Sequence, residues 1–337
     1  LKLSILNNQY EHVDFKICFS LVYSIQDIKG GTISKKVGRY YEIHSQQNDI
    51  IFTLQQPRIG SYNLSCGPEG LFILGKNDEK LECKIHTLKF ENPIPEVVYF
   101  DEQDEEFNPI IPVPYISKLE KEYTEIKNLE FKIPLNEYDF FKIFNNFVKV
   151  TDIKFDTSKG YSIEFVKTNL ENDEYEIIID KKSITIHHAD SGGKVYAVIT
   201  LIQLINYYKT KLPLGSIQDK PKLAWRGMHL DCVRQFYSID EIKRLLDYMC
   251  FFKLNRFHWH LTDNEAWRIE LDCYPELTSS GAFRGYNQLI PPFYGSGYYK
   301  YGGYYSKNEV LELIKYGQKL NIEIMPEIDL PAHSWTL

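Results

Sequence analysis

The stretch WRGMHLDCVRQFYSIDEIKRLLDYMCFFKLNRFHWHLTDNEAWRIEL (225–271) decides the fold of the C-terminal part of the chain. Within it, RGMHLDCV (226–233) and RFHWHLTD (256–263) are short, largely apolar runs that are typical of buried strands. Between them, SIDEIKRLLDYMCFFK (238–253) has helical spacing and a capping box that opens at Ser238. The stretch therefore predicts a strand, a helix and a second strand.

A second unit repeats this pattern towards the C-terminus. SKNEVLELIKYGQKLN (306–321) is a predicted helix with its own capping box, and IEIMPEIDL (322–330) is the third predicted strand. A Gly- and Tyr-rich excursion, residues 269–305, separates the two units. Strands that alternate with helices predict a parallel sheet, either doubly wound or a barrel. No glycine-rich phosphate loop follows a strand, which argues against a nucleotide-binding fold.

Two further domains are predicted before this sheet, so the fold is multidomain. Residues 1–114 contain short runs rich in β-branched and aromatic residues, with turn-forming clusters between them, and predict an antiparallel β-sandwich. A proline-rich, acidic segment closes this domain. Residues 115–218 predict a small α+β domain, and residues 219–337 hold the parallel sheet.

The elements expected in these two domains follow from local patterns. In the α+β domain, they are a helix around 138–150, a strand over 161–166, a β-hairpin over 175–189 and a second helix over 192–208. In the sandwich, they are strands at 15–25, 39–44, 49–56, 70–75 and 81–90.

Composition narrows the classes of partner. The 337 residues are 43% hydrophobic, enough for real cores, and 39 Lys and Arg against 46 Asp and Glu give a net charge of −7. Because no long basic tract is present, nucleic acid is not an expected partner. No apolar run reaches the roughly 18 residues of a membrane span, and no signal peptide is visible in a sequence that begins at Leu1. The compartment stays unknown from these residues.

The six cysteines and one acidic run carry no metal-binding pattern. The cysteines are scattered without metal-ligand spacing, and we expect most of them to be buried thiols, with a disulfide between Cys66 and Cys83 as the alternative. The run DEQDEE (101–106) is expected to be a solvated loop, because no calcium-loop spacing accompanies it.

Polar residues follow all three predicted strands of the parallel sheet. Functional residues of parallel α/β folds lie at the carboxyl ends of strands, because the loops there converge over one edge. Aromatic rings beside carboxylates and an arginine suit a polyhydroxylated sugar ring. The polar candidates, in strand order, are Asp231 and Arg234, then His258, His260, Asp263 and Glu265, then Glu327, Asp329 and His333; the aromatic candidates are Trp259, Trp267 and Trp335.

Three ordered motifs resemble those of glycoside hydrolase family 20, the β-N-acetylhexosaminidases. RGMHLDCVR (226–234), HWHLTDNEAWR (258–268) and PEIDLPAHS (326–334) match the typical patterns RGxxLDxxR, HWHLxDxxxWR and PExDxPGHS. The resemblance implies a (β/α)8 TIM barrel, of which about three strands are present, preceded by the family's small α+β domain and by a carbohydrate-binding-like sandwich similar to that of bacterial chitobiases.

The same resemblance implies an activity. It is the removal of terminal non-reducing N-acetylhexosamine from chitooligosaccharides or glycans, with no cofactor and no metal. The expected partner is an oligosaccharide that contains N-acetylhexosamine, and a periplasmic or exported location is favoured. The linkage and the preference between gluco and galacto sugars stay open.

The resemblance also assigns roles to individual residues. Arg234 matches the arginine that grips hydroxyls of the terminal sugar, and a guanidinium fork fits two adjacent hydroxyls. Asp263 and His333 match residues that support the general acid, which must stay protonated near the working pH. Trp267 is expected to contact the substrate.

Two mild departures and one large departure from the family are visible. The mild ones are Ala332, where glycine is usual, and residues 264–266, where Asp-Gln-Gly is common. In the family, the substrate's own N-acetyl carbonyl attacks C1 with overall retention, an aspartate orients the amide, and the adjacent glutamate protonates the leaving oxygen. Residues 1–337 contain no such Asp-Glu pair in its usual GGDE-like setting. We therefore expect these residues alone to be inactive and prone to association, unless a second polypeptide completes the barrel.

Two other functions stay open at this point. His258 and His260 alternate onto one face of a strand, as in metal-dependent TIM-barrel hydrolases, and Asp263 or His333 would complete a zinc site. Alternatively, the chain is a non-catalytic carbohydrate-binding remnant that keeps the sandwich and Arg234.

Overall fold

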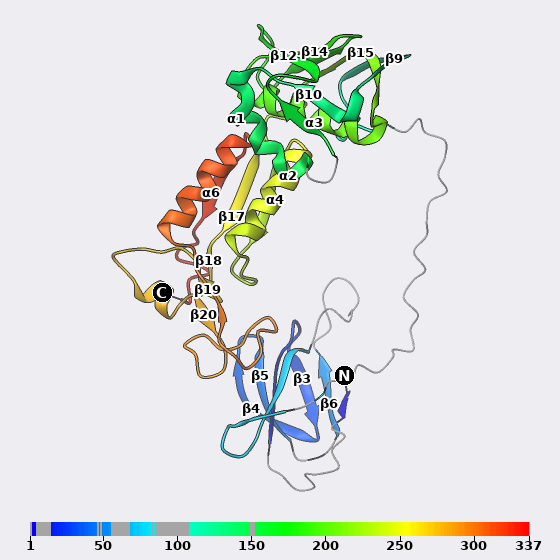
Figure 1. Ribbon diagram of the computed structural model, residues 1–337. Coiled ribbons are helices and arrows are strands. Elements are labelled where there is room, and N and C mark those ends of the chain that lie inside the picture. Colours follow the sequence, from blue (N-terminus) through cyan, green and yellow to red (C-terminus); the bar gives the residue numbers. More distant parts are fainter. Residues whose placement is uncertain are drawn as a thin grey trace.

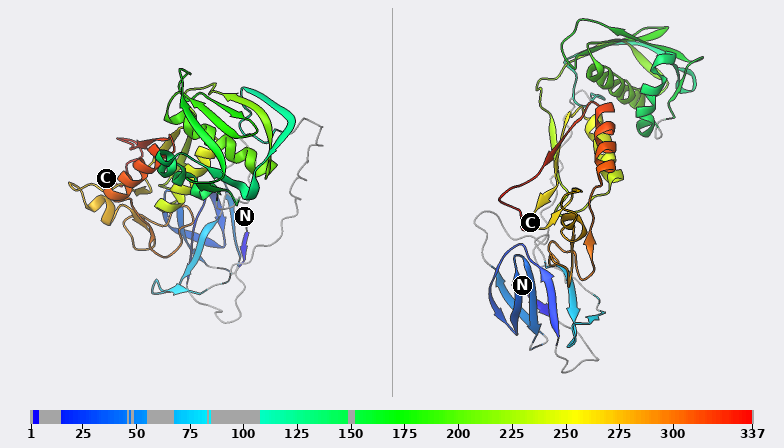
Figure 2. Two further views of the ribbon diagram at one scale, coloured as in Figure 1. Left: turned by 45° about the horizontal axis from the view of Figure 1, so that its top comes forward. Right: turned by 90° about the vertical axis from the view of Figure 1, so that its left-hand side faces the viewer.

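The computed structural model describes residues 2–4, 15–45, 47, 49–54, 68–82, 84, 108–148 and 152–336. The order of the parts in space differs from their order in the chain. The N-terminal sheets lie at one end, the sheet of residues 116–219 lies at the other, and residues 227–336 lie between them (Figure 1 and the right-hand view of Figure 2). The C-terminal part therefore contacts both of the others.

Two antiparallel sheets form the N-terminal part. Their strand orders are β1-β6-β3 and β4-β5-β2-β7-β8. Between them lies a core to which both sheets contribute, for example Phe19, Ile43 and Phe52. The strands predicted at 15–25, 39–44, 49–56 and 70–75 are present as β2, β5, β6 and β7, and the structure adds β1, β3 and β4. Of the strand predicted at 81–90, Leu81 lies in β8, and most of the rest lies outside the described residues. The bounds are β1 Lys2–Ser4, β2 Lys16–Ser20, β3 Ile25–Lys29, β4 Gly31–Val37, β5 Tyr40–Ser45, β6 Asp49–Leu54, β7 Glu69–Leu74 and β8 Lys80–Leu81.

The five-stranded sheet is covered on its second face too. Alternate residues of a strand point to opposite faces. Cys18, Tyr40 and Phe72 pack against Ile290 and Phe293 of the excursion. Burial on both faces explains why β2 is buried over four consecutive residues instead of alternating.

The strands between residues 116 and 219 form a seven-stranded mixed sheet. Its order is β11-β10-β12-β14-β13-β15-β9, and the long helix α3, Ser191–Tyr208, packs against it. The predicted hairpin over 175–189 and helix over 192–208 are confirmed. The strand bounds are β9 Ile116–Glu125, β10 Glu130–Lys132, β11 Lys154–Asp156, β12 Tyr161–Lys167, β13 Tyr175–Ile179, β14 Ser183–His188 and β15 Lys211–Asp219.

Local patterns missed part of this sheet. β9 is an edge strand with mostly exposed, charged side chains, so it lacks an apolar run, and β15 contains Pro213 and an irregular register at Gly215. The predicted helix around 138–150 is broken into α1, Tyr138–Phe141, and α2, Asn145–Val148.

The C-terminal part is built on a three-stranded parallel sheet. Its order is β16-β17-β22, and α4 and α6 pack against each other beside it (Figure 1). Both predicted capping boxes are present. The bounds are β16 Gly227–Asp231, α4 Ile239–Phe251, β17 Arg256–His260, α6 Lys307–Lys319 and β22 Glu323–Glu327, with the short elements β18 Thr262–Asp263, β19 Ala266–Trp267, α5 Glu276–Ser279, β20 Phe283–Arg284 and β21 Tyr301–Gly302 between them.

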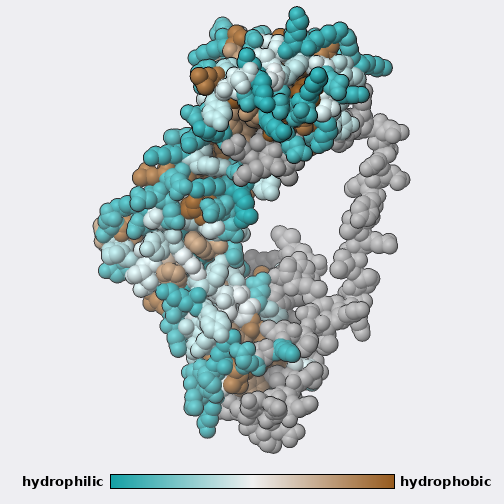
Figure 3. Space-filling view, in the orientation of Figure 1, coloured by the Kyte–Doolittle hydropathy of each residue, from teal (hydrophilic) through white to brown (hydrophobic). Residues whose placement is uncertain are grey.

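The surface is largely hydrophilic, and most of the described cysteines are buried. Figure 3 shows a largely hydrophilic face on which apolar residues are scattered. No helix among the described residues is both long and apolar enough to cross a membrane. Cys18, Cys232 and Cys250 are buried free thiols, as predicted for most of the cysteines, whereas Cys273 is exposed. Cys66, Cys83 and the acidic run 101–106 lie outside the described residues.

Candidate active site

Arg234 lies just beyond the carboxyl end of β16 and contacts three carboxylates. Its Nη2 lies 2.5 Å from Asp263 Oδ2, its Nε lies 2.9 Å from Glu265 Oε2, and its Nη1 donates to Asp231 Oδ2 at 3.0 Å. Burial lowers the pKa of Arg234, but the three negative charges outweigh burial, so the net pKa lies above its ordinary value. The guanidinium is therefore a permanent cation among acids from two separate segments, the end of β16 and residues 263–265.

Glu265 is a buried carboxylate with a raised pKa. Its side chain is only 12% exposed. Burial raises its pKa, Arg234 opposes this, and Asp263 adds to it, so that the net pKa lies above its ordinary value of 4.5. A buried carboxylate of this kind makes the stability of the folded chain depend on pH.

Glu265→Gln is expected to flatten that dependence. The folded state holds the Glu265 proton more tightly than the unfolded state, so its contribution to stability is present below pH 4.5 and is lost as pH rises through the raised pKa. Glutamine has the same shape and does not titrate. Denaturant unfolding at several pH values between about 4.5 and 7 should show a smaller loss of unfolding free energy in the variant than in the wild type. Equal slopes would contradict the raised pKa.

Asp263 connects Arg234 to two histidines. It is 2% exposed, its Oδ1 lies 3.0 Å from His333 Nδ1, and its Oδ2 lies 3.1 Å from His260 Nε2. The backbone N–H of Asn264 donates to the same carboxylate at 2.6 Å. His333 has a positive φ of 51°, a conformation that is uncommon for a residue with a side chain. The carboxylate thus fixes the orientation of the His333 ring, whose side chain is 54% exposed.

Glu327 at the end of β22 gathers three histidines on one face of the parallel sheet. Its carboxylate lies 2.6 Å from His258 Nε2, 3.1 Å from His260 Nδ1 and 3.6 Å from His229 Nε2. The prediction that His258 and His260 share a face is therefore confirmed, because both reach the same carboxylate. Glu327 contacts both histidines, whereas the predicted Asp263 contacts His260.

Two groups of side chains could hold a metal ion. The donor atoms of His229, His260 and Glu327 lie within 4.8 Å of one another, and so do those of His260, Asp263 and Asp329. Imidazole and carboxylate donors suit zinc. His260 already pairs with Asp263 and Glu327, although His260 Nδ1 and Glu327 Oε2 are buried without a hydrogen-bond partner among the described residues. A metal ion stays a prediction that metal analysis of the purified protein tests.

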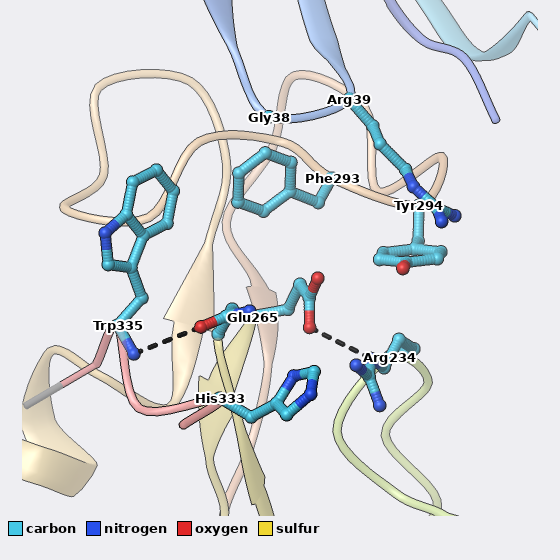
Figure 4. Close-up of a pocket in the computed structure, with 9 residues that line it drawn as sticks. Gly38, Arg39, Arg234, Glu265, Phe293, Tyr294, His333 and Trp335 are labelled. Atoms are coloured by element: carbon cyan, nitrogen blue, oxygen red, sulfur yellow. Dashed lines mark hydrogen bonds and ion pairs between the residues drawn. The ribbon is translucent and has the colours of Figure 1, made fainter. Parts of the chain in front are cut away.

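A pocket of about 480 Å³ opens above Arg234 (Figure 4). Phe293 and Trp335 form an apolar wall, with their rings stacked at 6.4 Å between centroids. Glu265 and His333 lie on the other side of the pocket from Phe293 in Figure 4. The lining comes from five segments of the chain and consists of Gly38, Arg39, Arg234, Asn264, Glu265, Phe293, Tyr294, His333 and Trp335.

Two buried arginines hold the loop that carries Arg234. Arg268 is 0% exposed and donates to four carbonyls: Cys232 O at 2.9 Å, Val233 O at 2.7 Å, Ala282 O at 2.5 Å and Gly303 O at 2.9 Å. Burial, and then the charge of Arg284, lowers the pKa of Arg268 to about 10, which still leaves it charged at neutral pH. Arg284 donates to Val233 O at 3.2 Å and Arg234 O at 2.5 Å. The excursion and the loop after β16 are therefore joined through guanidinium groups.

The predicted tryptophan contact does not match the structure. Trp267 is 4% exposed, donates its Nε1–H to Ile269 O at 2.6 Å and does not line the pocket. Trp259 is fully buried as well. Their burial follows from their place on β17 and β19, whose apolar residues pack in the core. Trp335, which is 66% exposed, is the tryptophan that reaches the pocket.

Comparison with known families matches the chain in two consecutive blocks. The description "Glycosyl hydrolase family 20, catalytic domain" covers residues 223–337, and "Glycosyl hydrolase family 20, domain 2" covers residues 134–220. The chain belongs to glycosyl hydrolase family 20.

The relatives that this family 20 chain matches are named as hexosaminidases, a chitobiase and an N-acetylglucosaminidase. It is 40% identical over 173 residues to the beta-hexosaminidase of Vibrio furnissii, covering 50% of this chain and 28% of that protein. It is 40% identical over 168 residues to the N,N'-diacetylchitobiase of Vibrio harveyi, covering 48% and 19%. The structure of the family 20 exo β-N-acetylglucosaminidase of Vibrio harveyi in complex with N-acetylglucosamine superposes with a TM-score of 0.83 at 25% identity, over 96% of this chain and 53% of that one. The chain thus spans about half of that structure and less than a third of the two named relatives.

The sequence singled out Arg234, Asp263, His333 and Trp335, but not the other residues that form the pocket walls. Arg234, Asp263 and His333 come from three motifs and meet at one place, although their roles stay predictions. Arg39 and Tyr294 were missed, because neither lies in a motif or at the end of a parallel strand. No local sequence pattern predicts that the turn between β4 and β5, in the N-terminal sandwich, lines this pocket.

Proposed function

We propose that this chain provides the substrate-gripping part of a β-N-acetylhexosaminidase that releases terminal non-reducing N-acetylhexosamine from chitooligosaccharides or glycans. The observation that carries the proposal is the meeting of Arg234, Asp263 and His333 around one pocket. In this proposal, β16, β17 and β22 belong to a (β/α)8 barrel. The domains are the sandwich 1–114, the α+β domain 115–218 and the barrel part 219–337.

Arg234 would hold the ring of the terminal sugar through two hydroxyls. A terminal N-acetylhexosamine is linked through C1 and carries its amide at C2, so its free hydroxyls are at C3, C4 and C6. Only the hydroxyls on C3 and C4 are adjacent, and a planar guanidinium fork donates well to such a pair. Phe293 and Trp335 offer an apolar wall for the C–H face of the ring. Glu265, which also lines the pocket, adds a hydrogen-bond acceptor.

Asp263 and His333 would act on the proton donor of the reaction. His333 is held through Nδ1, which leaves its other ring nitrogen available on an exposed side chain. In the family mechanism, the N-acetyl carbonyl attacks C1 and a glutamic acid protonates the leaving oxygen. Among the described residues, Glu265, the one carboxylate that lines the pocket, is paired with Arg234 and is not free for this step. Residues 1–337 should therefore bind the sugar without cleaving it.

The relatives support the ligand class. The Vibrio harveyi enzyme was crystallised in complex with N-acetylglucosamine, and a Streptomyces plicatus beta-hexosaminidase variant, 24% identical to this chain, was crystallised in complex with the product GlcNAc. Both outer strands of the parallel sheet, β16 and β22, have a free edge within the described part of the chain. A second polypeptide that adds strands at these edges is part of the proposal.

A paired measurement tests this function. Calorimetry or ligand-observed NMR with methyl N-acetyl-β-glucosaminide should show saturable binding to residues 1–337, and a chromogenic N-acetylglucosaminide should give no turnover. Methyl β-glucoside, which lacks the amide, is the control ligand. Absence of binding would refute the sugar pocket, and robust turnover would refute the assignment of the proton donor.

A further inference from the structure

Three neighbouring strands place histidines and one glutamate on the same face of the parallel sheet. His229 of β16 is the register partner of His258 in β17, and His260 of β17 is the register partner of Glu327 in β22. Adjacent strands lie about 4.8 Å apart, and residues i and i+2 of one strand share a face. The sheet itself therefore brings these side chains together. We call them the histidine cluster: His229, His258, His260 and Glu327.

The spacing of the donor atoms in the histidine cluster fits one tetrahedral metal ion. Ligand atoms that lie about 2.0–2.1 Å from zinc lie roughly 3.4 Å from one another. In the structure, His260 Nδ1 lies 3.1 Å from Glu327 Oε1, and His229 Nε2 lies 3.6 Å from Glu327 Oε2. The donor atoms of these three residues all lie within 4.8 Å of one another. His258 Nε2, which lies 2.6 Å from Glu327 Oε2, offers the fourth donor.

One nitrogen of the cluster is buried without a hydrogen bond. His260 is 4% exposed, and its Nδ1 has no hydrogen-bond partner among the described residues. Glu327 lies close to this nitrogen, but not in hydrogen-bond geometry, and its Oε2 is buried without a hydrogen bond as well. Buried polar atoms of this kind are rare in folded proteins. A metal ion would satisfy both atoms, because a neutral imidazole nitrogen and a carboxylate oxygen both donate an electron pair.

The other ring nitrogen of His260 is held by Asp263. His260 Nε2 lies 3.1 Å from Asp263 Oδ2 and 3.3 Å from Arg234 Nη1. When Nε2–H donates to this carboxylate, the lone pair of Nδ1 faces Glu327. Metal-binding histidines commonly donate their second nitrogen to a carboxylate, which fixes the ring and makes it a better ligand. Asp263 therefore supports His260 as a metal ligand.

A neighbouring group, formed by His260, Asp263 and Asp329, is less suited to a cation. Its donor atoms also lie within 4.8 Å of one another. Asp263, however, is already paired with Arg234 at 2.5 Å, so a cation at this carboxylate would meet the positive charge of the guanidinium. Within the described part of the chain, Glu327 pairs with histidines only. The histidine cluster is therefore the better site.

We infer that the histidine cluster binds one divalent transition-metal ion of the class of Zn²⁺. Three imidazoles and one carboxylate suit zinc and cobalt(II) better than magnesium or calcium, which prefer oxygen ligands. The side chains of His229 and His258 are 49% and 46% exposed, so an ion can reach them from solvent, whereas His260 closes the buried side. None of the four residues lines the sugar pocket, so this inference does not depend on the proposed function, and the ion has no part in the proposed reaction.

Titration of residues 1–337 with Zn²⁺ tests this site. The protein is prepared without a polyhistidine tag and treated with a chelator first. Calorimetry should then show one Zn²⁺ per chain with a Kd below about 10 µM, and an excess of Mg²⁺ should not compete. Bound Co²⁺ should give the visible absorption of an ion with nitrogen ligands. Zn²⁺ should also raise the midpoint of thermal unfolding, because a ligand of the folded state stabilises it.

Variants locate the ion. Glu327→Gln and His229→Ala each remove one ligand and should weaken Zn²⁺ binding by at least about 10-fold. His187→Ala is the matched control, because His187 pairs with Glu176 at 2.9 Å in a different sheet. Asp329→Asn removes a ligand of the neighbouring group only. Neither of these last two changes should alter the affinity.

Thermal unfolding without metal shows which variants are folded. His229 is half-exposed, so His229→Ala keeps the test decisive if Glu327→Gln does not fold. A Kd above about 10 µM overturns the inference, and so does affinity that the two ligand variants leave unchanged. Equal weakening by His187→Ala would show adventitious binding to surface histidines, and weakening by Asp329→Asn alone would assign the ion to the neighbouring group. Each of these results leaves the proposed function standing, because no sugar takes part in the measurement.

Discussion

Arg268→Met should lower the free energy of unfolding by about 3 to 5 kcal/mol, because it leaves buried carbonyl groups without donors. The Arg268 side chain is fully buried, and its four hydrogen bonds go to the loop after β16 and to the excursion. Methionine fills much of the volume but donates nothing. Urea unfolding followed by circular dichroism measures the loss.

An arginine of β17 provides the control. Arg256 is partly exposed, donates to Asn255 O at 2.9 Å and pairs with Glu323 at 3.2 Å. Arg256→Met should cost less than about 1 kcal/mol, because exposed ion pairs contribute little. Similar losses at both positions would show that the carbonyls around Arg268 find other donors. Since two of these carbonyls belong to Cys232 and Val233, sugar binding should weaken in the Arg268 variant as well.

Arg234→Ala should weaken the binding of methyl N-acetyl-β-glucosaminide by about 30- to 150-fold, the equivalent of roughly 2 to 3 kcal/mol for a lost charged hydrogen-bond donor. Arg234→Lys keeps the charge but not the planar fork, so it should recover only part of the affinity. Arg244 lies exposed on α4, and Arg244→Ala is the matched loss of one positive charge. Calorimetry on the three variants measures the effect. If the Arg234→Ala and Arg244→Ala variants bind methyl N-acetyl-β-glucosaminide with equal affinity, Arg234 does not hold the sugar.

The same variant should change how stability depends on pH. Burial raises the pKa of Asp231, but hydrogen bonds from the backbone of Val233 and Arg234 and the charge of Arg234 bring it below its ordinary value. Such a carboxylate stabilises the folded state above its ordinary pKa, and the stabilisation is lost as pH falls. Arg234→Ala removes part of this contribution. The variant should therefore lose most stability near neutral pH and approach the wild type in acid.

The sequence was most informative where structure is local. Helical spacing and the pairs Ser238 with Glu241 and Ser306 with Glu309 predicted α4 and α6, because a capping box depends on four consecutive residues. β9 was missed because its neighbours in the sheet, not its own side chains, make it a strand. Trp267 was predicted to contact the sugar, but its ring is buried. The residue type alone does not show whether a tryptophan ring faces the core or the pocket.

The sequence by itself predicted the parallel sheet and the family, and its motifs singled out Arg234, Asp263 and His333, whose roles stay proposals, because each motif joins a strand to the polar residues at its carboxyl end. Only the tertiary structure decided how this chemistry is arranged. Three carboxylates converge on Arg234, Glu327 collects three histidines, and a turn of the sandwich places Arg39 on the wall of the pocket. The physical reason is that these contacts join residues far apart in the chain, and their energies depend on burial and distance, which no local pattern of residues encodes.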